Sequence, residues 1–131
     1  MAETQTDTRI GGVGTVIVPV TDQDAALEFY TQRLGFEVRG DTPFGDGMRW
    51  IEVAPPGAVT TVALVPPREG DPVGIDMPAA LSTDDADAAH AALKERGVDV
   101  DEEVSRMGDP VPPMFWFRDQ DGNSLFIVER E

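Results

Sequence analysis

The chain has 131 residues, 40% of them hydrophobic and none of them cysteine, which fits one packed domain without disulfides or thiolate sites in a reducing cytoplasm. Its formal charge of −15, from 25 acidic against 10 basic side chains, disfavours binding to nucleic acid, which requires Lys and Arg at the phosphates. The sequence has no apolar run of about 18 residues and no apolar leader, so we expect no membrane segment and no signal peptide.

The first half of the chain predicts a strand followed directly by a helix. Residues 1–9 are polar, and we expect them to form a flexible tail. Alternating apolar residues predict a strand over residues 14–20. Thr21 or Asp22 can cap the helix that follows, and Gly35 supplies its left-handed C-terminal stop.

Three further strands complete this half. The pattern predicts a short strand at residues 36–39, a turn-rich connection over 40–47, and a hairpin with strands at 48–53 and 60–65. The segment 54–57 forms a turn, because its Pro and Gly residues preset the dihedral angles.

The second half repeats this order. Thr21-Asp22 recurs as Thr83-Asp84, and Trp50 recurs as Trp116, so the chain is an internal repeat. The expected elements are a strand at 79–82, a helix from Asp84 or Asp85 to Gly97, a short strand at 98–100, a long loop at 101–113, and a hairpin with strands at 114–118 and 124–128.

These elements predict an α+β chain of two tandem βαβββ modules, with the helices against one face of a mixed sheet. Module one covers residues 10–65, a linker rich in Pro and Gly covers 66–76, and module two covers 77–131. A module of this size is marginally stable alone, so we expect the two to share buried surface. Paired modules of this kind also predict a cleft between them.

Four motifs resemble those of a known family. They are the run Val18-Pro19-Val20-Thr21-Asp22, the helix ends Leu34-Gly35-Phe36 and Lys94-Glu95-Arg96-Gly97-Val98, and the turn Arg118-Asp119-Gln120-Asp121-Gly122-Asn123. In order and spacing they resemble the vicinal oxygen chelate superfamily of glyoxalases, bleomycin-resistance proteins and extradiol dioxygenases. The resemblance implies a cup-shaped sheet and a homodimer with clefts between its subunits. In catalytic members it also implies a divalent metal held by His and Glu from the first and last strand of each module.

The positions that would hold this metal lack suitable side chains. The resemblance maps the first-strand ligands to Thr15 and Pro78, and the last-strand ligands to Phe126 and to Leu64, or to Ala63 after a one-residue register shift. Zinc, nickel and iron sites need imidazole or carboxylate ligands. We therefore expect no metal and no cofactor.

Strand alternation selects the side chains expected to face the cup. The predicted ligand-binding residues are Thr15, Ile17, Met48, Trp50, Glu52, Leu64, Met114, Trp116, Arg118 and Phe126. The same alternation adds Val62, Ser124 and Val128 and assigns Val16, Val18, Val20, Ile51, Val53, Ala63 and Val65 to the core. An aromatic and thioether-rich surface of this kind suits an apolar or aromatic small molecule, with Glu52 and Arg118 able to orient it.

Alternative interpretations remain open for these residues. Trp50 and Trp116 occupy equivalent positions, and could equally fill the core or a dimer interface. Glu52 is either an exposed strand-end acid or a weak catalytic candidate whose pKa burial would raise. The only histidine, His90, lies in the second helix, and we interpret it as a partly exposed helix residue.

The sequence therefore predicts a protein of this superfamily that binds a small hydrophobic or aromatic molecule without the usual metal ligands. One alternative is a lyase, isomerase or dioxygenase that uses Zn, Ni, Mn or Fe, or that uses Glu52 for metal-free acid–base chemistry. A second alternative is a non-catalytic dimeric module whose cleft is filled.

Overall fold

The computed structural model describes residues 8–130, so residues 1–7 of the expected tail lie outside the described part. The elements in chain order are β1 (Thr15–Pro19), α1 (Gln23–Glu28), the π-helical turn η1 (Phe29–Arg33), β2 (Glu37–Phe44), β3 (Met48–Ala54), β4 (Thr61–Val65), β5 (Asp76–Thr83), α2 (Ala86–Glu95), β6 (Asp99–Val100), β7 (Met114–Arg118) and β8 (Ser124–Glu129). This order contains βαβββ twice, which confirms the predicted α+β chain of two tandem modules.

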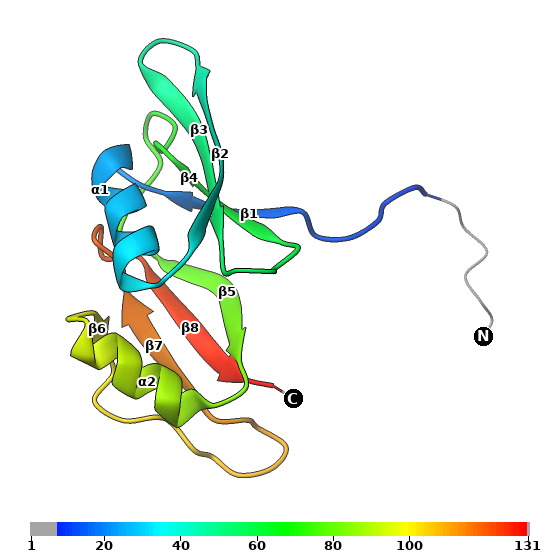
Figure 1. Cartoon of the computed structure of the whole chain (residues 1–131), viewed down its shortest axis with the longest axis vertical. Helices are drawn as coiled ribbons and strands as arrows, with labels where there is room; N and C mark the ends of the chain where they lie inside the picture. The colour runs from blue at the N-terminus through cyan, green and yellow to red at the C-terminus, as the bar shows by residue number, and fades with distance from the viewer. Residues whose placement is uncertain (1–7, 131) are drawn as a thin grey trace.

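The two sheets share one topology. Their strand orders are β1-β4-β3-β2 and β5-β8-β7-β6. The pairs β1–β4 and β5–β8 are parallel, and the remaining pairs are antiparallel. Helices α1 and α2 lie on the same side of the molecule, each against its own sheet (Figure 1). The opposite side of each sheet, called the open face below, carries no helix within residues 8–130.

The local signals for the helix ends act as predicted. The Asp22 carboxylate accepts a hydrogen bond from the Ala25 amide at 3.1 Å, and Asp85 caps α2 in the same way. Gly35 and Gly97 follow the two helices with φ of 78° and 80°. Because L side chains avoid this left-handed region, glycine is the natural stop at both positions.

Two expected boundaries differ. Strand β2 extends to Phe44, through most of the segment expected to be a connection, because the long β2–β3 hairpin continues to the pair Phe44 and Met48. Its turn is confined to residues 45–47, where Gly45 and Gly47 have positive φ. Strand β5 begins at Asp76, which pairs with Ser124, so the structure ends the linker one residue before the predicted boundary.

One hydrophobic core extends through both modules. It combines Val18 and Ile51 from the first sheet with Phe117 and Leu125 from the second, and Tyr30 lies among them with none of its surface exposed. The shared core is the outcome expected for two modules too small to be stable alone. Among the described residues, no helix is long and apolar enough to cross a membrane.

A buried turn between β7 and β8 joins the modules. The Tyr30 hydroxyl of module one donates to the Asp119 carboxylate at 2.8 Å. The Asn123 side chain is fully buried, donates to the Pro19 carbonyl at 2.8 Å, and accepts from the Gly74 and Ile75 amides. Buried polar groups need such partners, so this network specifies how the modules meet.

The ionisation of Tyr30 can be measured, and it reports on this junction. Burial, together with the nearby Asp119 carboxylate, holds the pKa of Tyr30 well above its usual value. The stabilisation is therefore complete below the unfolded-state pKa of about 10 and is lost as the pH rises above it. Because Tyr30 is the only tyrosine, we expect tyrosinate absorbance to appear only as the protein unfolds in alkali.

Replacing Tyr30 by Phe removes the hydroxyl donor from a charged acceptor. We expect the free energy of unfolding in urea to fall by about 1–3 kcal/mol at neutral pH. Thr31→Val is a matched control, because the Thr31 hydroxyl bonds only within its own helix, to Leu27 and Glu28 carbonyls. Equal stability of Tyr30→Phe and the wild type would contradict a role for this bond in joining the modules.

Candidate functional site

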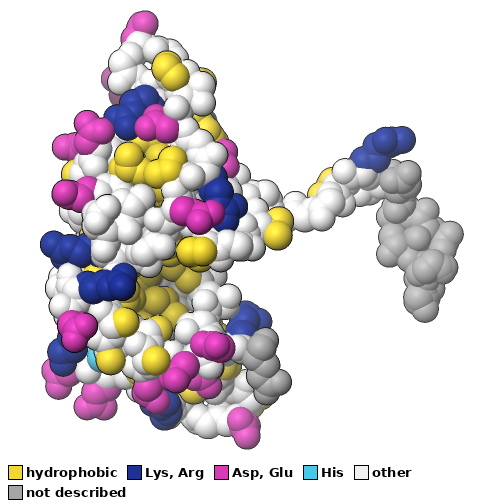
Figure 2. All heavy atoms as spheres, viewed as in Figure 1, with side chains coloured by type: hydrophobic (Ala, Val, Ile, Leu, Met, Phe, Trp, Pro, Cys, Tyr) yellow, Lys and Arg dark blue, Asp and Glu magenta, His cyan; other side chains and the backbone are white. Residues whose placement is uncertain are grey.

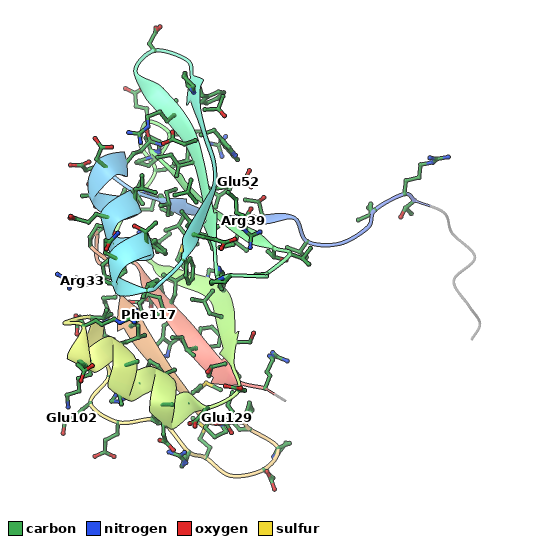
Figure 3. All side chains as sticks on the ribbon, in the orientation of Figure 1. Arg33, Arg39, Glu52, Glu102, Phe117 and Glu129 are labelled. Carbon is green, nitrogen blue, oxygen red and sulfur yellow. The ribbon has the colours of Figure 1, made fainter. Side chains whose placement is uncertain are left out.

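Strand pairing defines the open face of the first sheet. On β3 and β4, Glu52 lies opposite Ala63, and on β1 and β4, Thr15 lies opposite Thr61 and Ile17 opposite Ala63. Paired residues project to the same side of a sheet, so these five side chains share the open face. Figure 3 shows Glu52 on the side of β3 that faces away from α1.

The hairpin adds further open-face residues. Thr42 pairs with Trp50, and Phe44 pairs with Met48. The Phe44 and Trp50 rings meet edge to face with centroids 6.3 Å apart. Phe44 and Ile17 are 51% and 55% exposed, which leaves two large apolar side chains uncovered on this face.

A chain of hydrogen bonds crosses the open face of module one. The Trp50 indole N–H donates to Glu52 Oε2 at 2.7 Å, and the Thr61 hydroxyl donates to Glu52 Oε1 at 2.7 Å. The Thr15 and Thr61 hydroxyl oxygens are 2.9 Å apart. The Glu52 carboxylate is therefore held in one orientation by donors on two strands.

The pKa of Glu52 is shifted away from the value that would suit a general base at neutral pH. Hydrogen bonds from Trp50 and then Thr61 stabilise the charged form, and they lower the pKa of Glu52 despite some desolvation. The raised pKa that the catalytic alternative required is therefore not found, because the side chain lies on an open sheet face and accepts hydrogen bonds from two donors. Glu52 is an ionised acceptor at neutral pH.

The open face of module two is aromatic. Trp116 pairs with Phe126, and their rings are 4.8 Å apart between centroids. Met114 pairs with Val128 on the same side, next to this stack. Phe115 and Phe117 alternate with these residues and are fully buried in the core. The two tryptophans therefore occupy open faces, with intermediate exposure, rather than the core.

Arg118 shares a face with Ser124 but is already engaged. Its guanidinium donates to Asp99 and Asp101, each at 2.9 Å. These two carboxylates raise the pKa of Arg118 above its ordinary value. Its predicted role in orienting a ligand would have to use the N–H donors that these two carboxylates leave free.

One predicted cup residue lies in the core. Leu64 pairs with Ile51 and with Val18, is fully buried, and belongs to the hydrophobic core. Val62 pairs with Val16 and Val53 and also belongs to the core, whereas Ala63 faces the open side together with Glu52. The prediction for β4 was one residue out of register, and a shift of one residue reverses every side chain of a strand.

With this register corrected, the residues that the metal-binding resemblance points to are Thr15, Ala63, Pro78 and Phe126. One weakly donating hydroxyl and three groups without a donor do not fit a divalent metal. Residues 8–130 contain no group of three or more His, Asp or Glu side chains placed to hold an ion. His90 is half-buried, with Nε2 2.6 Å from the Asp101 carbonyl oxygen and its ring against Phe115.

An apolar groove of about 710 Å³ lies where the modules meet. Val16 and Phe36 line it from module one, and Leu81, Ala92 and Arg96 line it from module two. Hydrophobic side chains are visible in the hollow at this junction in Figure 2. None of the ten predicted ligand-binding residues lines this groove. A second hollow, of about 490 Å³, lies between η1 and β7, and of the ten it includes Arg118 alone.

Comparison with protein families agrees with this architecture. The model of the Glyoxalase/Bleomycin resistance protein/Dioxygenase superfamily matches residues 12–127. The chain belongs to this superfamily. The Bacillus subtilis (strain 168) protein YetH is 32% identical over 126 residues, which is 89% of this chain and 97% of YetH.

Two solved structures are also similar to this chain. TnmS3, an antibiotic binding protein from Streptomyces sp. CB03234, is 38% identical with a TM-score of 0.83, over 95% of this chain and 100% of that one. A superfamily member from Sphaerobacter thermophilus DSM 20745 is 38% identical with a TM-score of 0.85, over 93% of this chain and 99% of that one.

Sequence reasoning missed two residues of the open face of module one. Thr61 is the donor that links Glu52 to Thr15, and it is 8% exposed. Gly40 lies directly opposite Glu52 on β2. A signal for Thr61 was present, because a threonine at the start of a buried strand needs a partner for its hydroxyl.

Replacing Thr61 by Val tests the origin of the Glu52 pKa. Loss of one donor should raise the pKa of Glu52 toward its ordinary value, as followed by ¹³C NMR titration of its carboxyl carbon. Because the pKa of Glu52 is lower in the folded protein than in the unfolded chain, its ionisation stabilises the fold at pH values above the unfolded-state pKa, and this contribution is lost as the pH falls. The free energy of unfolding should therefore decrease less on acidification in Thr61→Val than in the wild type. Thr60→Val is the control, because Thr60 donates to the Val13 carbonyl instead. An unchanged Glu52 titration would contradict this assignment.

Proposed function

We propose that this protein binds a small hydrophobic or aromatic molecule on its open faces, without a metal and without a cofactor. The observation that carries the proposal is the composition of these faces. They combine Trp50, the Trp116–Phe126 stack and Met114 with the fixed Glu52 carboxylate, where a metal-dependent relative would need imidazole and carboxylate ligands. The similarity to TnmS3, described as an antibiotic binding protein, supports the same class of activity.

A second copy of the chain completes the site in this proposal. The open face of module one leaves Ile17 and Phe44 more than half exposed, and neither of the two hollows described above includes Trp50, Glu52 or Trp116. Large exposed apolar side chains on one face favour contact with another surface. A homodimer that brings open faces together would form a cleft with aromatic walls. The absence of cysteine suits a reducing compartment such as the cytoplasm.

The enzymatic alternative has less support. A general base works best with a pKa near the operating pH, and the Trp50 and Thr61 hydrogen bonds move the pKa of Glu52 in the opposite direction. The second alternative is a non-catalytic dimeric module whose cleft is filled. Because the tryptophans lie on the open faces, this alternative requires their rings to pack against a partner chain and leave no space for a ligand.

Tryptophan fluorescence tests the proposal directly, because both tryptophans lie on the open faces and none lines the junction groove. We expect saturable quenching by neutral polycyclic aromatic compounds such as anthraquinone, in chelator-treated protein. Phe126→Ala should weaken binding about tenfold through loss of an aromatic contact. Ala92→Leu, which narrows the junction groove, is the matched control and should leave the affinity unchanged.

Two results would contradict this assignment. Flat fluorescence across a broad aromatic panel would remove the proposed function. Loss of binding in Ala92→Leu with full binding in Phe126→Ala would move the site from the open faces to the groove.

A further inference from the structure

Glu52 is an ionised carboxylate without a basic partner. The ion pairs of residues 8–130 use Asp24, Glu37, Asp41 and other acids, but none involves Glu52. Its two oxygens accept one hydrogen bond each, from Trp50 and Thr61. A carboxylate has about four acceptor sites, so each oxygen can accept again from a group outside the chain.

The strand beside Glu52 leaves room for such a group. Gly40 lies directly across from Glu52 on β2. A Cβ atom built at Gly40 would have no heavy atom within 4 Å beyond its chain neighbours, and its φ lies outside the left-handed region. The backbone therefore does not require glycine at this position, and the missing side chain opens the surface next to the carboxylate.

The groups around this opening have complementary chemistry. The Trp50 indole is tied to the carboxylate through its N–H, so an aromatic ring and a negative charge lie side by side. Organic cations are attracted both by a carboxylate and by the face of an indole. An anionic group would meet the Glu52 charge and the net charge of −15.

We propose that the ligand of the open face carries a positively charged nitrogen beside its apolar body, and that Glu52 and Trp50 bind this nitrogen in the opening left by Gly40. The inference rests on the proposed function and narrows it to amphiphilic organic cations, such as protonated or quaternary amines on an aromatic frame. Thr61 is a positioning residue, because it holds the carboxylate and lies on the strand beyond it.

Three probes that share one aromatic body separate charge from apolar contact. They are 1-naphthylmethylamine, which is protonated at neutral pH, the neutral 1-naphthylmethanol, and the anion 1-naphthylacetate. Binding is followed by ¹H–¹⁵N NMR, where the Trp50 indole N–H reports directly on the Glu52 hydrogen bond. We expect the amine to bind about tenfold more tightly than the alcohol, the anion to bind most weakly, and the Trp50 signal to shift with the amine.

Three variants make the test specific. Glu52→Gln should abolish the preference for the amine, whereas Glu103→Gln, which removes the same charge from an exposed loop residue, should retain it. Gly40→Val fills the opening without forcing the backbone into a strained region. It should lower the affinity for the amine measured from the Trp50 signal. The dispersion of the NMR spectrum confirms that each variant is folded.

Equal affinities for amine and alcohol, unchanged by Glu52→Gln, would overturn this inference and leave the proposed binding function in place. Shifts by the amine that survive Gly40→Val would overturn the assigned location. The absence of any shift with all three probes would overturn the inference, and failure of the neutral aromatic panel in fluorescence as well would remove the proposed function.

Discussion

The hydrogen bonds of one buried turn hold the two modules together, and the positions of both open faces depend on them. Asp119 accepts from Tyr30 of module one, and Asn123 ties the end of β1 to the start of β5. These groups are inside the protein, where an unpaired polar atom is costly. The turn therefore favours one relative orientation of two sheets that are otherwise joined by a linker and a shared apolar core.

Strand register determines what each sheet presents on its open face. In module one, the pairs Glu52 with Ala63 and Thr15 with Thr61 place a fixed carboxylate among hydroxyl groups, close to Trp50. In module two, the equivalent surface is an aromatic stack of Trp116 and Phe126. The two modules thus present a carboxylate that can hydrogen-bond and an aromatic surface. This combination suits recognition of a small organic molecule better than coordination of an ion.

Much of this arrangement could be predicted from the sequence, for local reasons. Asp22, Asp85, Gly35 and Gly97 act within a few residues of their own positions, so the helix ends follow from the residue types. The strand at Met114–Arg118 agrees with the prediction because a short run of apolar and aromatic residues lies between a Pro-rich loop and the Asp-Gly-Asn turn.

The errors concern interactions between strands. In β4, Val62, Ala63, Leu64 and Val65 are all apolar, so the sequence contains no alternation that identifies the buried face, and only the pairing with β1 and β3 places Leu64 in the core. The choice between the two interpretations of Glu52 could not be made from the sequence for the same reason, since the Thr61 donor comes from a neighbouring strand. The repeat predicted a cleft between the modules, but the residues that line the junction groove come from both modules and were not identified.

We propose that this glyoxalase-superfamily scaffold operates without a metal. A thermal-unfolding titration of tag-free, chelator-treated protein with Ni²⁺, Zn²⁺, Mn²⁺ and Fe²⁺ tests it most directly. A metal at about 1,000 times its dissociation constant would stabilise the fold by about 4 kcal/mol, enough to raise the midpoint by several degrees. We expect no saturable shift with any of the four ions. A saturable increase with one of them would show that Thr15, Ala63, Pro78 and Phe126 do not mark a lost site, and would favour a metal-dependent enzyme.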